Sequence, residues 1–295
     1  MQIYKIREIV QNIKPDIIHC HCFWPTILAG IFLKKEIIVS TLHNNPLEDY
    51  FYEYGFLVSK IMTKISLKFQ KSFYMNFAIS NYIKKIYIDL GVKEDNLKVI
   101  YNGVKKIEQI ERKKKSKTIN LITVSVLNKI KNILFLLEVC KELNNRNIQF
   151  LFKIVGDGED REKIEKKIQE YKLEEKILLI GKSSRENVYR EMQNADIFLF
   201  ASKSEGFGLV IIEAIYNGLK VLVPNIPVMS EIVREGIDGY ILDFQVTDYV
   251  EKIIELNSSK INSFNSERID KRFLVENMSE YYTEEYKKII KKVFK

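Results

Sequence analysis

Short apolar runs alternate with longer amphipathic stretches over most of the chain. The apolar runs predict strands, and the stretches between them have the spacing of helices. The predicted strands are residues 16–19, 37–42, 76–79, 98–101, 120–124, 149–155, 176–180, 196–200, 220–223 and 239–242. The predicted helices include residues 132–143, 161–171, 185–192 and 209–216. This alternation predicts an α/β fold with parallel sheets covered on both faces.

A polar, charged stretch interrupts the alternation at residues 105–117 and includes the basic run 112–115. Such a stretch is typical of a linker between domains. We therefore expect two Rossmann-like domains facing a cleft, at 1–111 and 118–271, with ligands at the carboxyl ends of the strands. Residues 272–295 have helical spacing and are expected to form a C-terminal helix.

The composition and the net charge limit the classes of partner that the protein is expected to bind. The chain has 295 residues, 46% of them hydrophobic, and a net charge of +8. Such a balance fits an anionic partner, such as a membrane surface, a phosphorylated lipid or a nucleic acid. No RNA-recognition motif or zinc-finger spacing occurs, so nucleic-acid binding is not expected. Three cysteines and first residues unlike a signal peptide indicate a reducing cytoplasm.

The run His19-Cys20-His21-Cys22 has residue types that ligate metals. In a strand, however, alternate residues share a face, so the histidines would point one way and the cysteines the other. No second cluster supplies the remaining ligands of a structural zinc site. We therefore expect no metal.

The stretch 204–214 carries the most specific chemistry. It places Glu205 and Glu213, with seven residues between them, across a glycine-rich turn that leads into an apolar helical stretch. Gly206 and Gly208 have no Cβ to block a ligand from backbone N–H groups. A helix N-terminus favours an anion such as a diphosphate, whereas carboxylates accept hydrogen bonds from sugar hydroxyls. The segment predicts a ligand with both phosphates and sugars.

The two glutamates alone fit other interpretations. Glutamate is a common residue of solvated surface helices. Glycoside hydrolysis also uses two carboxylates, and sequence spacing does not give their separation in space. The phosphate-type features around the pair favour transfer from a nucleotide-sugar over hydrolysis.

The same stretch resembles the E-x7-E motif of retaining glycosyltransferases of family 4, which have the GT-B fold. Other segments resemble the motifs of this family in the family's order, over nearly the whole chain. They are PDIIHCH at 15–21, STLH at 40–43, AIS at 78–80, VIYNGV at 99–104, TVSVL at 123–127 with KN at 131–132, IVGDG at 154–158 and ADIFLFAS at 195–202. The ordered set is more specific than any one motif.

The resemblance implies a nucleotide-sugar, with UDP as the expected nucleotide, in the second domain. Glu213 would accept hydrogen bonds from the ribose hydroxyls, and Glu205 from hydroxyls of the donor sugar. The backbone N–H groups that face the donor would belong to Gly206, Phe207, Gly208 and Leu209. The first domain would be the acceptor domain, and the C-terminal helix would cross back onto it.

The resemblance also implies further site residues. Lys131 would pair with the diphosphate and stabilise the leaving group as negative charge builds on it. Gly156, Gly158 and Lys182 would line the base. His43 would contact the donor sugar near the reacting carbon; with Glu205 and Lys131 it completes the expected catalytic set.

Two features depart from the family pattern. Val126 stands where the family has an arginine on the diphosphate, so that contact is missing or comes from elsewhere; Lys129 and Arg185 are candidates. The first predicted strand already matches the PDIIHCH segment, so the usual first strand and glycine-rich loop are expected to be missing. No D-x-D motif is present, which favours a mechanism without a metal ion.

The leading hypothesis is retaining transfer of a hexose or N-acetylhexosamine to an envelope polysaccharide, a lipopolysaccharide or a lipid-linked acceptor. The alternatives are a catalytically impaired nucleotide-sugar-binding remnant, one chain of a split transferase, and another GT-B enzyme such as an epimerase or a phosphorylase. If the front strands are missing, the His19 strand becomes an open edge with Ile17, Ile18 and Phe23 facing solvent or a partner, and turnover is expected to be poor.

A further expectation is peripheral attachment to the inner face of the plasma membrane. Between residues 57 and 73, Lys60, Lys64 and Lys68 recur at helical spacing, and an apolar stripe of Ile61, Ile65 and Phe69 runs beside them. A basic amphipathic helix of this kind can lie on anionic lipid. The alternative is a stripe that faces the core, with the lysines as its solvated edge.

Overall fold

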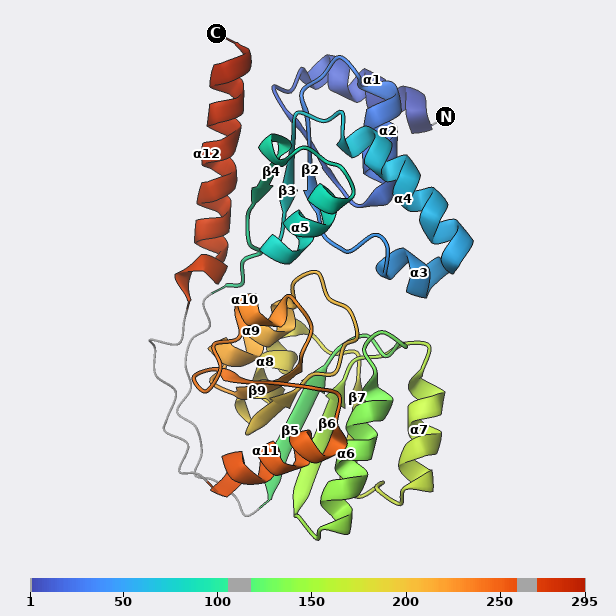
Figure 1. Cartoon of the computed structure of the whole chain (residues 1–295), viewed down its shortest axis with the longest axis vertical. Helices are drawn as coiled ribbons and strands as arrows, with labels where there is room; N and C mark the ends of the chain where they lie inside the picture. The colour runs from blue at the N-terminus through green and yellow to red at the C-terminus, as the bar shows by residue number, and fades with distance from the viewer. Residues whose placement is uncertain (1, 106–117, 259–269, 295) are drawn as a thin grey trace. The chain divides into compact units, whose positions relative to one another are not determined.

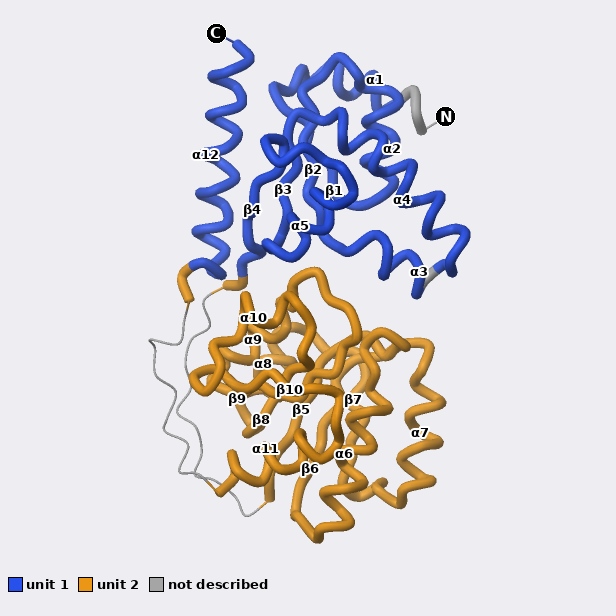
Figure 2. The backbone as a smooth tube through the Cα atoms, in the orientation of Figure 1, with its two compact units in different colours: residues 1–103, 272–295 blue, residues 104–271 orange. Residues whose placement is uncertain are grey.

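The computed structural model describes residues 2–105, 118–258 and 270–294. The chain forms two compact units, shown in Figures 1 and 2. Unit 1 contains residues 1–103 and 272–295, and unit 2 contains residues 104–271. The linker expected at 105–117, with its basic run, falls outside the described residues except for Lys105.

Unit 1 is built on a parallel sheet of four strands in the order β1-β2-β3-β4. The strands are β1 (Ile18–His21), β2 (Ile38–Leu42), β3 (Met75–Ala78) and β4 (Leu97–Val99). The helices are α1 (Gln2–Ile13), α2 (Phe23–Phe32), α3 (Asp49–Tyr54), α4 (Phe56–Gln70), α5 (Asn81–Asp89) and α12 (Val275–Val293), with a 3-10 turn at Glu94–Asn96. β1 is therefore an edge strand, paired only with β2 among the described strands.

The two faces of the unit 1 sheet bury different partners. On one face, Cys20 and Ile38 pack with residues of α1 and α2. On the other face, Val39 and Phe77 pack with Ile289 and aromatic side chains of α12. This alternation follows the two-residue period of a strand. It also places the C-terminal segment against the sheet that contains the N-terminal strand (Figure 1).

The edge strand is less open than its sequence predicts. Ile17, Ile18 and Phe23 are half-buried. Ile17 packs against the α12 cluster, and Ile18 packs against the α2 cluster together with Ile6 of α1. These three side chains, expected to face solvent or a partner, are thus partly covered by helices of the same unit. Helix α1 is not among the predicted helices, and it contributes to this burial.

Unit 2 is a parallel sheet of six strands in the order β10-β9-β8-β5-β6-β7. The strands are β5 (Ile119–Val124), β6 (Phe150–Val155), β7 (Ile177–Gly181), β8 (Ile197–Leu199), β9 (Lys220–Pro224) and β10 (Gly239–Leu242). The helices are α6 (Ile133–Asn145), α7 (Arg161–Glu170), α8 (Arg185–Gln193), α9 (Leu209–Tyr216), α10 (Met229–Ile232) and α11 (Val246–Ser258). This is the strand order of a doubly wound sheet. From β5 the chain adds β6 and β7 on one side, and then β8, β9 and β10 on the other, so the order of winding reverses between β5 and β8.

The fold class predicted from the sequence is confirmed. Each predicted strand corresponds to an observed strand, with ends that differ by up to two residues. Unit 2 has an apolar core of strand residues and of α6, α7 and α11 side chains, including Phe152, Leu136 and Tyr249. None of the described helices is long and apolar enough to cross a bilayer.

Candidate functional site

The reversal between β5 and β8 is where a doubly wound sheet binds ligands, because the loops leaving these two strands diverge there. The loop after β5 leads through Lys131 to α6, and the loop after β8 leads through Glu205 to α9. A backbone hydrogen bond of 2.8 Å from Lys203 N–H to the carbonyl of Ile130 joins the two loops. The fold therefore brings two of the predicted site residues to one place.

Lys131 and Glu205 form an ion pair in this structure. Their side chains are 23% and 13% exposed. The lysine ammonium also lies 5.8 Å from the centre of the Phe200 ring. The loop is fixed locally, since the Lys131 N–H donates to the side-chain oxygen of Asn128 at 3.1 Å. The sequence assigned these two residues separate roles, whereas the structure pairs them.

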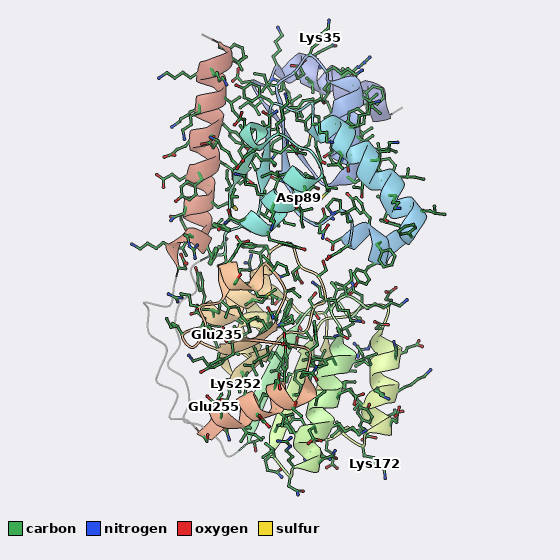
Figure 3. The ribbon with its side chains drawn as sticks, in the orientation of Figure 1. Lys35, Asp89, Lys172, Glu235, Lys252 and Glu255 are labelled. Atoms are coloured by element: carbon green, nitrogen blue, oxygen red, sulfur yellow. The ribbon has the colours of Figure 1, made fainter. Side chains whose placement is uncertain are left out.

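One other charged pair is a poorer candidate because its carboxylate is largely exposed. Lys252 and Glu255, both labelled in Figure 3, lie one turn apart on α11, with 2.6 Å between ammonium and carboxylate. Glu255 is 57% exposed. Exposed pairs of this kind contribute little to stability and do not converge on a ligand.

Helix α9 begins directly after the glycine turn. Its N-cap is Gly208, at φ 100° in the left-handed region, so the first turn has no side-chain cap. A Cβ on Gly208 would lie 3.0 Å from Ile211 Cδ1. The preceding Phe207 is buried and anchors the turn, whereas Leu209 is 39% exposed. An uncapped helix start with aligned N–H groups suits an anion.

Glu213 lies inside α9 and meets two side chains of α8. Arg185 Nη2 is 2.7 Å from its Oε1, and the Tyr189 hydroxyl donates to the same oxygen at 3.0 Å. Arg185 Nε also donates to the Tyr189 oxygen at 2.6 Å. Arg185, a candidate for the missing phosphate contact, is thus paired with Glu213. No sequence motif pointed to Tyr189, although its position four residues after Arg185 puts both on one face of α8.

The two glycines after β6 have a structural reason to be glycine. A Cβ on Gly156, at φ 133°, would lie 1.8 Å from the Ser125 carbonyl oxygen, and one on Gly158 would lie 2.3 Å from that of Leu127. This turn therefore packs directly against the loop after β5. Lys182 is exposed after β7.

The position of the family arginine is occupied by an exposed apolar side chain. Val126 is 58% exposed in the loop after β5, and Lys129 of the same loop is exposed as well. The neighbouring Ser125 has a buried hydroxyl oxygen with no hydrogen-bond partner among the described residues. No motif pointed to Ser125, whose polar atom lies at the carboxyl end of β5.

The third predicted catalytic residue, His43, belongs to unit 1. It follows β2, and its Nε2 lies 2.9 Å from Nδ1 of His21 at the end of β1. His21 stacks on His19, with ring centres 4.3 Å apart. Nε2 of His19 lies 2.8 Å from the Thr41 hydroxyl, and its Nδ1 shares a hydrogen bond with the Tyr286 hydroxyl of α12. Sequence spacing gave no sign that α12 would join this cluster.

Burial keeps this histidine cluster uncharged at neutral pH. Desolvation, with smaller contributions from His21 and His43, lowers the pKa of His19 to about 4. Burial also lowers the pKa of His21, and burial together with His21 lowers the pKa of His43. The residue types fit a metal site, but both ring nitrogens of His19 already have partners. Among the described residues no group of at least three His, Cys, Asp or Glu side chains could hold a metal ion.

Comparison with known proteins gives the class of this fold and site. The model of the family described as glycosyl transferases group 1 matches residues 104–271. The model described as Glycosyltransferase Family 4 matches residues 2–106. The chain therefore belongs to the group 1 glycosyltransferases, and the resemblance to glycosyltransferase family 4 is confirmed.

Two relatives and one solved structure illustrate the match. An uncharacterized glycosyltransferase, MJ1178, of Methanocaldococcus jannaschii is 28% identical over 86% of this chain and 69% of its own length. The O-antigen biosynthesis glycosyltransferase WclY of Escherichia coli is 27% identical over 78% of this chain and 67% of its own. Other relatives match over as little as 27% of their own length. The structure of Anabaena HepE with UDP and glucose superposes with a TM-score of 0.78 at 18% identity, covering 95% of this chain and 80% of that one.

Proposed function

We propose that this protein transfers a hexose or an N-acetylhexosamine from a UDP-sugar to an envelope glycan or lipid-linked acceptor, with retention of configuration and without a metal ion. The observation that carries the proposal is the Lys131–Glu205 pair at the strand reversal of unit 2, beside the uncapped start of α9. A cation, a carboxylate and a helix N-terminus together match the phosphates and hydroxyls of a nucleotide-sugar.

The ion pair gives each of its members a role in donor binding. On binding, the diphosphate would replace the carboxylate as the partner of the Lys131 ammonium, and Glu205 would accept hydrogen bonds from the donor sugar. Lys131 then supplies the positive charge that stabilises the leaving diphosphate. The pair holds Lys131 in place until the donor arrives, so little conformational entropy remains to be lost on binding.

Glu213 is proposed to hold the ribose. Within the described residues both hydrogen bonds to its carboxylate fall on Oε1, so Oε2 remains an acceptor for a ribose hydroxyl. Arg185 and Tyr189 orient the carboxylate. Gly206 to Leu209 would present backbone N–H groups, and Gly156, Gly158 and Lys182 would lie near the base. The UDP and glucose of the HepE structure support this class of donor.

In unit 1, His43 is proposed to contact the donor sugar during transfer. The lowered pKa keeps its ring neutral at pH 7, so it can offer a hydrogen bond without adding a charge next to the reacting carbon. The acceptor is proposed to bind unit 1, and the reaction to take place at the inner face of the plasma membrane.

One experiment tests the donor and the metal together. Titration calorimetry with UDP, UDP-glucose, UDP-N-acetylglucosamine and GDP-mannose should show binding of the UDP compounds in the presence of EDTA. Loss of binding with EDTA would contradict the metal-free proposal, and preference for GDP-mannose would contradict the UDP assignment. The anomeric configuration of the product, read by NMR, tests retention.

The exposed Val126 favours a second candidate, a nucleotide-sugar-binding protein with impaired turnover. Without an arginine, one phosphate contact is absent from this loop. The two candidates differ in a transfer assay on purified monomer with a UDP-sugar that binds. Robust transfer excludes the impaired protein, whereas donor binding without transfer, improved by Val126→Arg, supports it.

A further inference from the structure

Helix α4 has its apolar face outside and its polar face inside. Its most exposed large apolar side chains are Leu57 at 74% and Phe56 and Ile61, each at 59%, followed by Val58 and Ile65. The buried residues of the helix are Ser59, Thr63, Ser66, Leu67 and Gln70. A helix on the surface of a globular unit normally shows the opposite arrangement. The alternative that Ile61 and Ile65 face the core is therefore wrong.

Local contacts fix this orientation. The Thr63 hydroxyl donates to the Pro46 carbonyl at 3.0 Å, and the Ser66 hydroxyl donates to the Thr63 carbonyl at 3.0 Å. At the far end of α4, a Cβ on Gly30 of α2 would lie 2.1 Å from Phe69 Cδ1. Small hydroxyl residues with satisfied hydrogen bonds, and a ring seated on a glycine, allow α2 and α4 to pack closely. The exposed apolar face is thus a stable feature of the unit.

The apolar surface continues onto α3. Phe51, Tyr52 and Tyr54 of this helix are between 42% and 49% exposed, and Phe56 at the start of α4 is 59% exposed. We call the exposed apolar side chains of α3 and α4 the α3–α4 face. It borders a cavity of about 350 Å³ whose lining includes Tyr54, Trp24 and His43. An apolar surface of this extent marks an interaction site.

The charges beside this face select its partner. Lys60, Lys64 and Lys68 recur along α4, and the helix has no acidic residue. The Lys60 ammonium lies 4.1 Å from the centre of the Phe56 ring. Lysines flanking an apolar stripe can extend to lipid phosphates while their stems lie along the apolar surface. A second copy of the chain would place like charges opposite each other in a twofold interface, which is unfavourable.

We propose that the α3–α4 face docks on an anionic lipid bilayer, with Leu57 and Ile61 inserted below the headgroups and the three lysines at the level of the phosphates. The inference rests on the proposed function in one respect, namely that a lipid-linked acceptor lies in such a membrane. Docking itself requires neither donor nor transfer. It gives unit 1 access to an acceptor that stays in the bilayer.

Cosedimentation with vesicles tests the docking surface. The protein should bind vesicles of phosphatidylglycerol and phosphatidylcholine and bind pure phosphatidylcholine weakly. Replacing Lys60, Lys64 and Lys68 by Gln should weaken binding about fivefold per lysine. Leu57→Ser with Ile61→Ser should weaken it by at least tenfold. The matched control replaces three exposed lysines of α12, Lys287, Lys291 and Lys292, by Gln, and should retain most of the binding.

Three outcomes would overturn the inference: no binding to either vesicle, equal loss of binding in the α12 control, or self-association in solution that Leu57→Ser abolishes. UDP affinity is measured on every variant. Because the proposed UDP site belongs to unit 2, the fold of unit 1 is checked separately, by the urea unfolding of every variant. If the wild-type chain binds vesicles but not UDP, the proposed function fails while the docking surface stands.

Discussion

The two units place their candidate residues at the same kind of position, the carboxyl ends of parallel strands, but they fill it with different chemistry. In unit 2 the groups are charged and paired: Lys131 with Glu205, and Arg185 with Glu213. In unit 1 the corresponding strand ends hold His21 and His43 within a cluster that burial keeps neutral.

This difference indicates how each unit meets a ligand. Paired charges can exchange one partner for another, so Lys131 can pair with a diphosphate while Glu205 accepts hydrogen bonds from hydroxyls. Neutral imidazoles and tyrosine hydroxyls offer hydrogen bonds without attracting counter-ions. This difference supports the proposal that unit 2 binds the charged donor and unit 1 an uncharged sugar or acceptor group.

The largest expected effect concerns the backbone contact on which the unit 2 site depends. Gly156→Ala would force a Cβ to 1.8 Å from the Ser125 carbonyl oxygen at φ 133°, which should lower the free energy of unfolding by about 3 kcal/mol or more. Gly236→Ala is the control: φ is 75° with nothing within 4 Å, so about 1 kcal/mol is expected. Equal losses in the free energy of unfolding, measured with urea, would show that the loop after β5 moves readily to accommodate the added Cβ.

Removing the cation of unit 2 should reduce donor affinity next most. Lys131→Ala should weaken UDP binding by about 10- to 100-fold, since hydrogen bonds to charged groups contribute about 1.5–3 kcal/mol. Lys166→Ala removes an exposed lysine of α7 and should change affinity by less than about threefold. Calorimetric titration of UDP against both variants measures these two changes in affinity. A similar loss in both would point to a diffuse positive field.

The pairing of Lys131 with Glu205 predicts non-additive effects. Lys131→Ala leaves Glu205 without its partner, and Glu205→Gln leaves Lys131 without its own. The double variant should therefore be more stable than the sum of the single effects predicts, by about 0.5–3 kcal/mol. A double-mutant cycle in urea measures this coupling. An additive cycle would mean that the pair adds nothing to the folded state.

A smaller effect is expected from the neutral histidine cluster of unit 1, namely a change in how the free energy of unfolding depends on pH. The folded-state pKa of His19 is about 4, below its ordinary value of 6.5. The unfolded chain thus binds more protons, so this contribution to stability is complete above pH 6.5 and is lost as the pH falls towards 4. His19→Gln should flatten the pH dependence of unfolding in this window, whereas His21→Gln should flatten it less. An unchanged profile in His19→Gln would contradict the assigned burial.

The sequence was sufficient for the strands and for the doubly wound class, because each rests on local patterns. It also predicted Glu205, Glu213 and Lys131 from motifs, and their roles remain predictions. It was not sufficient for side-chain pairing. Arg185 and Glu213 are 28 positions apart, and only the packing of α8 beside α9 brings them together. The periodicity of α4 predicted an apolar stripe but not whether this stripe faces the core or the solvent. The small hydroxyl residues on the opposite face can be buried because they satisfy their hydrogen bonds locally.

The central claim is that the charged site of unit 2 binds a nucleotide through Glu213. The most direct measurement is calorimetric titration of UDP, in EDTA, against wild type, Glu213→Gln and the exposed control Glu186→Gln. The account predicts binding by wild type and by Glu186→Gln, and a loss of about tenfold or more in Glu213→Gln. Equal affinities for wild type and Glu213→Gln would contradict it.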